Sequence, residues 1–360
     1  MIARALALCA LLAGLLAWDR ALARRAAGQR HAATQDVGRI LGEEALKGLD
    51  VAALRLEWSD GRPPVTYAPV GGSWRCLEAF GAPADEQALE SLMGAVTRAE
   101  GYVQSDDPGQ AAAYGIGTRE TVRFMICGRN VLKDAAGHDA QWSVDVGRSR
   151  PGGDGVFLRP LGTTEIWAVD QDPRGAIDGQ VAPGLPPLLD PSLVTKSWQA
   201  SSRGFARIFV DRADGSSVEL ATRPRELSEE EQRQGALPYE WIIDPAGEAL
   251  VPPQGRAMAY AYYLQAAGYR SVLDPRRAQE LGLGAPHDKL TLFPAEPDAK
   301  PLELHVLPPA PGGGVPVVNP LSNTVYEIDP AKAPLLLPGK AELMDAGEQN
   351  PWEAELDQGR

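Results

Sequence analysis

Cysteine and histidine are scarce in this chain, with 3 and 4 copies among 360 residues. The chain contains no Cys-x-x-Cys, His-x-x-x-His or His-Glu-x-x-His, the spacings that bring zinc ligands together. The four histidines stand in dissimilar contexts, at His31, His138, His287 and His305. The sequence therefore predicts no metal site.

The common motifs of catalytic and nucleotide-binding sites are also missing. Gly-x-Ser-x-Gly, which places a nucleophilic serine on a sharp turn, does not occur. The Gly-x-Gly segments at 115–117 and 282–284 are followed neither by the third glycine of a dinucleotide fingerprint nor by Gly-Lys-Ser. We interpret both as turns, and we predict no catalytic residue, no cofactor-binding residue and no cofactor.

Positive charge is in short supply, because 35 Lys and Arg face 48 Asp and Glu, for a net charge of −13. Nucleic acids are therefore not expected as partners, since phosphate binding needs clustered Lys and Arg. Residues 1–34 hold five Arg and one Asp, so they carry +4 and leave −17 on the rest of the chain. A basic end on an acidic body is typical of a membrane-targeting segment that precedes a soluble domain.

The N-terminal apolar run covers residues 5–18, which is shorter than the roughly 20 residues of a full membrane span. Its length and the small-x-small segment Ala21-Leu22-Ala23 favour a signal peptide. The alternative is an uncleaved anchor, and the arginines after the run favour a cytoplasmic C-terminal side. We predict that residues 1–34 are a signal peptide or membrane anchor and that the body faces the periplasm or another extracytoplasmic side.

The three cysteines constrain the structure little. Cys9 lies in the apolar run, whereas Cys76 and Cys127 lie in strand-like segments. These two side chains could pair in an oxidising compartment. We favour two separate buried thiols, with the disulfide as the alternative.

What the chain does contain is an internal repeat. The matched pairs, each 167 positions apart, are Trp74 with Trp241, Gly101-Tyr102 with Gly268-Tyr269, Asp107-Pro108 with Asp274-Pro275, Gly115 with Gly282 and Gly117 with Gly284. An ordered series at one spacing indicates two copies of one unit. The repeated residues are turn formers and core residues, so the scaffold is duplicated without a duplicated catalytic set.

Each copy reads as strands, one helix and more strands. Period-two alternation on either side of Asp60-Gly61 and of Asp214-Gly215 predicts a hairpin that opens each copy. Amphipathic helices are expected over about 84–100 and 254–267, each ended by a glycine. We expect Trp74 and Leu92 in the core. The order predicts an α+β fold of two tandem copies of a largely antiparallel sheet unit, each with one main amphipathic helix.

The predicted domains follow from this repeat. They are a signal peptide or anchor at 1–34, a first repeat at 50–172, a Pro- and Gly-rich linker at 173–200, a second repeat at 201–338 and an acidic tail at 339–360. The second copy has 13 extra residues at about 223–235, where Ser228 and Glu231 form a capping-box pattern for a short acidic helix. The tail is expected to be loose.

Carboxylates are the remaining candidates for chemistry. Asp106-Asp107 is the most tempting pair, but Asp107 recurs as Asp274, again before proline, which favours a turn or cap. A calcium role for Asp154, in a glycine-rich loop, lacks the EF-hand pattern.

Several segments of the first copy follow the pattern of a known family, in order, over about a hundred residues. They are Trp74, Pro83-Ala84-Asp85, Tyr114-Gly115-Ile116, Val146-Gly147, Val156-Phe157-Leu158 and Ile166-Trp167-Ala168-Val169. On these segments the chain resembles DUF4340, bacterial proteins of unknown function. Ile116 replaces an expected Leu, and Phe157 and Trp167 replace expected Tyr.

The resemblance implies a membrane-anchored extracytoplasmic protein, of a kind often encoded beside ABC-transporter components for gliding motility or envelope export. It implies no catalytic residues. We therefore expect a non-enzymatic accessory or docking protein of a cell-envelope membrane complex, linked to an ABC transporter and without a small-molecule ligand. The alternatives are an envelope glycan-active enzyme that uses unidentified carboxylates, or a module that binds a saccharide or peptide in the groove between the copies.

Overall fold

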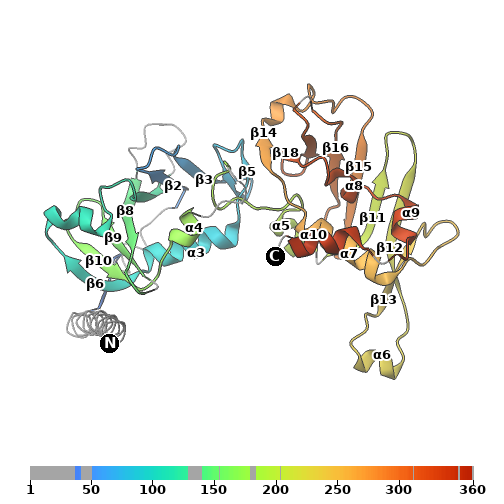
Figure 1. The fold of residues 1–360 in the computed structure, drawn as a ribbon, viewed down its shortest axis with the longest axis horizontal. Helices are drawn as coiled ribbons and strands as arrows, with labels where there is room; N and C mark the ends of the chain where they lie inside the picture. The colour runs from blue at the N-terminus through green and yellow to red at the C-terminus, as the bar shows by residue number, and fades with distance from the viewer. Residues whose placement is uncertain are drawn as a thin grey trace, which may run out of the picture. The chain divides into compact units, whose positions relative to one another are not determined.

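The computed structural model describes residues 37–41, 51–128, 140–153, 155–178, 184–202, 204–310, 312–347 and 349–358. Its strands form two antiparallel sheets of ten and eight strands, with few helices (Figure 1). This is the mixed α+β fold that the sequence predicts. The predictions for residues 1–34, His138 and Asp154 lie outside the described residues. No helix within the described ranges combines the length and apolar character needed to cross a membrane.

The ten-stranded sheet has the order β1-β6-β10-β9-β8-β7-β2-β3-β4-β5. Its elements are β1 (Gly38–Arg39), β2 (Ala53–Trp58), β3 (Val65–Val70), β4 (Ser73–Cys76), β5 (Ala82–Pro83), β6 (Glu100–Ser105), β7 (Val122–Cys127), β8 (Ala140–Ser149), β9 (Val156–Pro160) and β10 (Ile166–Val169). Helix α3 (Glu86–Thr97) follows β5, and the 3-10 helix η1 (Pro108–Tyr114) follows β6.

The eight-stranded sheet has the order β13-β12-β11-β15-β16-β17-β18-β14. Its elements are β11 (Phe205–Asp211), β12 (Ser217–Pro224), β13 (Tyr239–Ile243), β14 (Ser271–Leu273), β15 (Asp288–Pro294), β16 (Leu302–Val306), β17 (Val315–Asn319) and β18 (Thr324–Ile328). Helix α7 (Gln254–Ala266) follows β13, and η2 (Pro275–Arg277) follows β14. The other helices are α4 (Arg174–Asp178), α5 (Lys196–Ser202), α6 (Glu229–Arg233), α8 (Ala333–Leu336), α9 (Lys340–Met344) and α10 (Pro351–Gln358).

The two copies share one topology. In chain order, β2, β3 and β4 correspond to β11, β12 and β13, and β6 to β10 correspond to β14 to β18. With this matching, the order β6-β10-β9-β8-β7-β2-β3-β4 becomes β14-β18-β17-β16-β15-β11-β12-β13. This is the strand order of the second sheet, read from its other edge. The tryptophan strands are also anchored alike. The backbone N–H of Trp74 donates to Glu86 (3.2 Å), and that of Trp241 donates to Gln254 (2.7 Å). In each copy, the first residue of the main helix therefore ties that helix to the sheet.

The repeated glycines relate differently to the two main helices. Helix α7 ends at Ala266, with Ala267 as its C-cap directly before Gly268, as expected. Gly101, by contrast, does not end α3. Helix α3 ends at Thr97, and Gly101 is the second residue of β6. A Cβ at Gly101 would lie 2.2 Å from the carbonyl oxygen of Ala168 on β10. Gly268 also forms an isolated antiparallel β-bridge with Ser192. Close approach of two backbones, rather than a helix stop, therefore requires glycine at Gly101.

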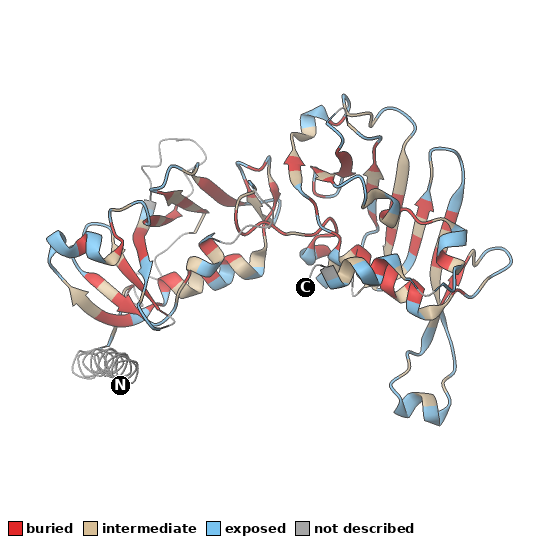
Figure 2. Ribbon diagram, viewed as in Figure 1, coloured by how far each residue is buried: buried red, intermediate tan, exposed pale blue. Residues whose placement is uncertain are grey.

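Figure 2 shows buried residues along the strands of both sheets. The exposed fractions of single residues confirm Leu92 as a core residue and correct Trp74. Leu92 is 2% exposed, and Trp241 is 4% exposed. Trp74 is only partly buried. It lies in β4 one position before Arg75, where the wall of a cavity keeps part of the indole accessible.

The chain forms two compact units that do not follow the order of the copies. The first unit comprises Met1–Pro64 and Ser91–Gly175, and the second comprises Val65–Glu90 and Ala176–Arg360. Strands β3 to β5 therefore belong to the second unit. The domain limits predicted from the sequence stay a prediction.

Within the second unit, residues 187–196 of the proposed linker are held by many contacts. Asp190 donates its N–H to the oxygen of Pro83 (3.0 Å), and its carbonyl oxygen accepts from the hydroxyl of Tyr269 (2.7 Å). The carboxylate of Asp190 accepts from the N–H groups of Ser192 (3.1 Å) and Lys196 (2.6 Å). Asp190 is 3% exposed, and burial raises the pKa of its carboxyl group.

Replacing Asp190 by alanine is expected to lower the free energy of unfolding by about 1–3 kcal/mol, because two backbone N–H groups lose their acceptor. A raised folded-state pKa means that the folded chain binds the proton more tightly than the unfolded chain. The side chain therefore contributes most below the ordinary carboxyl pKa, and this contribution shrinks as the pH rises through the raised value. Urea unfolding at several pH values measures both effects. Asp106→Ala, at an exposed site, is the control, and equal losses for the two variants would contradict the prediction.

The C-terminal residues pack against the second unit, so the expectation of a loose tail is wrong for α9 and α10. Leu343 and Trp352 are each 1% exposed. The ring of Trp352 lies 5.2 Å from that of Tyr260 on α7, and its Nε1 donates to the oxygen of Leu335 (3.0 Å). These two apolar side chains, together with ion pairs from Arg256 to Asp345 and from Lys332 to Glu355, hold a stretch whose composition is mostly polar.

Candidate functional site

The second copy carries an insertion between β12 and β13, and we call residues 225–238 the arm. The arm holds α6, whose predicted capping box is present. Ser228 Oγ accepts from the N–H of Glu231 (3.3 Å), and the Glu231 carboxylate accepts from the N–H of Ser228 (2.9 Å). Arg225 lies 3.2 Å from the same carboxylate. Local polar contacts therefore order the arm.

The arm has no core of its own. None of the residues of α6 is buried. The arm contains four Glu and two Arg, which gives a net charge of −2. Hydrogen bonds from Ser228 lower the pKa of Glu231, which keeps this carboxylate ionised at neutral pH. Figure 1 shows the arm extending away from the sheet that carries it. An ordered, acidic and largely exposed element is well suited to contact another molecule.

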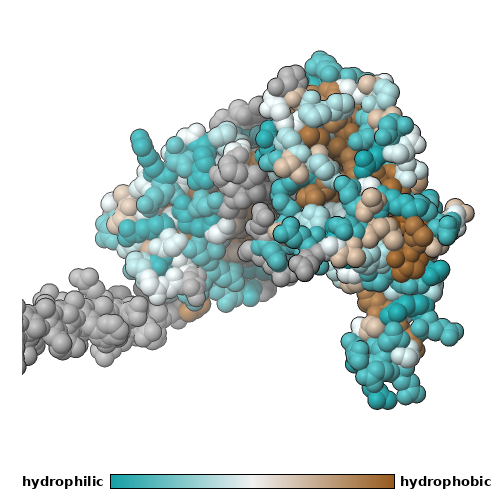
Figure 3. All heavy atoms as spheres, turned by 45° about the vertical axis from the view of Figure 1, so that its right-hand side comes forward, coloured by the Kyte–Doolittle hydropathy of each residue, from teal (hydrophilic) through white to brown (hydrophobic). Residues whose placement is uncertain are grey.

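A cleft of about 470 Å³ lies at the base of the arm, and we call it the arm cleft. Strands β11 to β13 line one side and α7 lines the other. Trp241 is buried, whereas Tyr239 and Tyr262 expose 37% and 53% of their surface, and Met258 lies between. In Figure 3 the arm is largely hydrophilic, and apolar residues gather on the body above it. The arm cleft therefore offers aromatic surface beside negative charge.

The carboxylates singled out in the sequence serve as caps. Asp107 accepts from the N–H of Gly109 (2.8 Å) at the start of η1, and Asp274 accepts from that of Arg276 (3.0 Å) at the start of η2. Arg276 also lowers the pKa of Asp274. The prediction of a cap at these two positions is confirmed. Asp106 is exposed beside Asp107.

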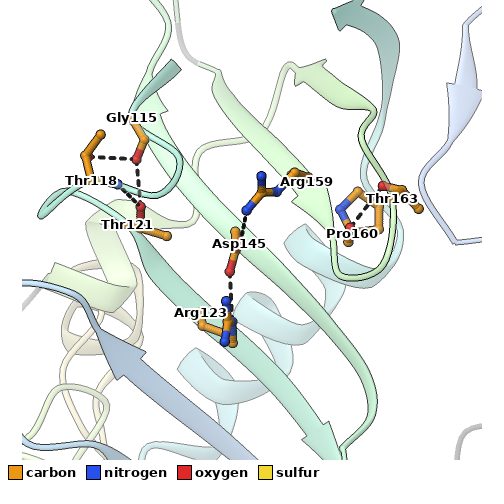
Figure 4. A network of polar contacts seen from close by, with 8 residues as sticks. All are labelled: Gly115, Thr118, Thr121, Arg123, Asp145, Arg159, Pro160 and Thr163. Carbon is orange, nitrogen blue, oxygen red and sulfur yellow. Dashed lines mark hydrogen bonds and ion pairs between the residues drawn. The ribbon is translucent and has the colours of Figure 1, made fainter. Parts of the chain in front are cut away.

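The interpretation of the Gly-x-Gly segments as turns is also confirmed. Gly115, with φ of 75°, caps the C-terminus of η1, and Gly282 has φ of 105°. Thr118 and Thr121 both donate their hydroxyl groups to the carbonyl oxygen of Gly115, at 3.1 and 2.9 Å (Figure 4). These contacts close a turn around Gly115.

A buried carboxylate that the sequence analysis missed lies in the first unit. Asp145 on β8 is 1% exposed and lies between Arg123 on β7 (2.9 Å) and Arg159 on β9 (2.7 Å), as Figure 4 shows. The three residues are direct cross-strand partners. Asp145 in turn raises the pKa of Arg123. Because both guanidinium groups are committed to the carboxylate, the group is a structural ion cluster.

Two histidines that looked unrelated in the sequence are hydrogen-bonded. His287 Nε2 lies 2.6 Å from His305 Nδ1, and His305 Nε2 lies 2.7 Å from the carboxylate of Glu303. Burial lowers the pKa of His305, and His287 and Lys289 act in the same direction, while Glu303 opposes them. No cluster of three or more side chains able to hold a metal occurs within the described ranges.

Cys76 and Cys127 are both buried, and no disulfide joins them. Burial raises the pKa of the Cys76 thiol to about 12, so its reactive thiolate is disfavoured. Of the alternatives left open by the sequence, the structure therefore matches separate buried thiols.

The family model DUF4340, a domain of unknown function, matches residues 74–179, which is fewer than a third of the chain. This confirms the resemblance found in the sequence. No curated protein matches. No solved structure matches either.

Proposed function

With a DUF4340 domain at residues 74–179, we propose that the protein is a non-enzymatic accessory protein that docks on a cell-envelope membrane complex, with an ABC transporter as that complex. Its body lies on the extracytoplasmic side, held or delivered by the N-terminal segment. Support comes from the basic N-terminus on an acidic chain and from the family resemblance. The observation that carries the proposal is the arm with its aromatic cleft.

The arm and the arm cleft together set the chemistry of the partner. A segment that fills the cleft gains by covering the exposed parts of Tyr239 and Tyr262, because aromatic side chains contribute most at protein interfaces. The arm beside it carries a net charge of −2. The partner is therefore a segment of a membrane protein that combines an apolar anchor with Lys or Arg, since complementary charge speeds and orients docking.

The arm belongs to the second copy and has no counterpart between β3 and β4 of the first. The two copies can therefore share a fold and differ in function. The first copy turns directly from β3 into β4, whereas the second inserts the arm between the corresponding strands β12 and β13. One copy therefore keeps the shared fold, and the other adds the contact surface to it.

The test is affinity capture with the full chain from detergent-solubilised membranes of the native host after chemical cross-linking. The expected result is recovery of ABC-transporter subunits, with recovery reduced about tenfold or more by a Tyr239→Ala/Tyr262→Ala variant, since two interface aromatics together carry more than about 1.4 kcal/mol. Leu161→Ala, at an apolar site that is 53% exposed in the first unit, is the matched control.

Two outcomes would contradict the proposal. The first is recovery of transporter subunits that the tyrosine variant leaves unchanged, which would remove the arm cleft from the interaction. The second is a single Asp→Asn change, at Asp106, Asp107 or Asp274, that abolishes function while abundance, folding and location stay normal. Catalysis concentrates in a few groups whose loss costs orders of magnitude in rate, whereas docking spreads over a surface.

A further inference from the structure

A second cavity of about 290 Å³ lies in the second unit, away from the arm, and we call it the arginine pocket. Four segments of that unit line it: residues 71–75, residues 83–86, residues 195–198, and residues 319–322 at the turn between β17 and β18. Its volume lies at the lower end of the range for small-molecule sites. The arginine pocket therefore has room for one small ring.

The pocket contains a positive charge that no described side chain neutralises. Arg75 is partly buried, and its Nη1 donates to the carbonyl oxygens of Gly81 (3.0 Å) and Ser322 (2.5 Å). Within the described part of the chain, no carboxylate lies within ion-pair distance of its guanidinium. By contrast, Arg256, which is 8% exposed, pairs with Asp345. Burial lowers the pKa of Arg75, which reflects the cost of an unpaired charge there.

Unpartnered polar atoms gather around this arginine. In the described residues, four buried side-chain polar atoms lack a hydrogen-bond partner, and three of them are Arg75 Nε, Ser322 Oγ and the hydroxyl of Tyr326. Ser322 lines the pocket and is only 8% exposed. Buried polar groups are nearly always hydrogen-bonded in native proteins, so the wall of the cavity behind Arg75 is unusually polar.

The remaining wall is suited to a hydroxylated ring. Trp74 stands on one side with part of its indole accessible, unlike its buried counterpart Trp241. Thr195 and Ser197 also line the cavity, with their hydroxyl oxygens 3.3 Å apart. An aromatic face and hydroxyl groups together favour a polar ring over an apolar peptide side chain.

One acidic residue in the pocket limits the charge of the ligand. Glu86 lines the cavity, and its carboxylate accepts from the backbone N–H of Trp74. The lining therefore carries one positive and one negative charge, so a second negative charge on the ligand would bring no net electrostatic gain over a single carboxylate.

We propose that the arginine pocket binds a sugar acid, with its carboxylate at the Arg75 guanidinium and its ring against Trp74. The two carbonyl oxygens that Arg75 contacts both accept from Nη1, so Nη2 is the nitrogen left to donate to a ligand carboxylate. Thr195 and Ser197 hydrogen-bond the ring hydroxyl groups. The arginine pocket and the arm cleft share no lining residue. Ligand binding in the arginine pocket can therefore be tested independently of the docking function.

The experiment titrates the purified full chain with glucuronate, glucose, acetate, inorganic phosphate and an N-acetylated dipeptide with a free C-terminal carboxylate. Tryptophan fluorescence and calorimetry report binding. Glucuronate is expected to bind with a dissociation constant in the millimolar range or tighter, and each of the other four at least about tenfold more weakly. Tighter binding of the dipeptide would overturn the assignment to a sugar, and absence of glucuronate binding would overturn the site.

Variants then test the residues. Arg75→Gln is expected to weaken glucuronate binding about tenfold or more, with unfolding stability unchanged or increased, because an uncompensated charge is removed. Arg75→Lys keeps the charge but loses the planar guanidinium, so its affinity for glucuronate should lie between that of the parent and that of Arg75→Gln. Trp74→Phe keeps a smaller ring and should weaken binding less than Arg75→Gln does. Arg98→Gln, at an exposed site in the first unit, should bind as the parent does, and an effect equal to that of Arg75→Gln would refute the proposal.

Discussion

Replacing Trp352 by alanine is expected to lower the free energy of unfolding by about 3–5 kcal/mol, the usual cost of removing a large aromatic side chain from a core. Trp352 is among the largest fully buried side chains of the described residues. It packs on Tyr260, donates to the oxygen of Leu335, and lies under the guanidinium of Arg256 at 5.6 Å. Its removal would leave a cavity between α10 and α7 and an orphaned carbonyl group.

Chemical denaturation of the full chain, followed by circular dichroism, measures this effect. Trp352→Phe should cost less, because it retains much of the apolar volume and loses only the indole hydrogen bond. A loss below about 1 kcal/mol for Trp352→Ala would mean that α10 detaches easily from α7, contrary to its burial.

The second large effect is expected at the ion cluster of Asp145. Replacing both Arg123 and Arg159 by methionine should lower the free energy of unfolding by about 3–5 kcal/mol, because a carboxylate that is 1% exposed would be left without a counter-charge. The guanidinium groups contribute charge rather than core packing, since their side chains are 38% and 24% exposed.

Asp145→Asn provides the matched comparison. This change leaves two arginines at partly exposed positions, where water can solvate them, so its cost should be clearly smaller. A triple variant that removes all three charges should recover much of the stability lost in the double variant. Denaturant unfolding of the three variants decides the matter, and a larger cost for Asp145→Asn than for the double arginine variant would contradict the argument.

The fold class was predictable because its signals are local and recur twice. Alternation around Asp60-Gly61 and Asp214-Gly215 marks β2–β3 and β11–β12, and both main helices occur where apolar spacing indicates them. The position at which α3 ends was harder to predict from the sequence. Gly101 resembles a stop signal in sequence, yet the need for glycine there comes from Ala168, which is distant along the chain.

The candidate sites depended on contacts that no local pattern encodes. Arg123, Asp145 and Arg159 meet only because β7, β8 and β9 pair in one particular register. The arginine pocket brings Arg75 beside Ser322, which is 247 positions away. By contrast, the arm was visible in the sequence, since an offset between repeats and the Ser228 capping box are both local signals.

The strand order also bears on how the protein can be divided for production. The family match covers residues 74–179, but β7 within it pairs along its length with β2, at Ala53–Trp58. A fragment cut at the limits of the match would expose the hydrogen-bonding edge of β7 and invite association between copies. The boundaries of a recognisable sequence are therefore not those of a soluble fragment, and recombinant work on this protein should retain β2, which covers β7, and β1, which pairs with β6.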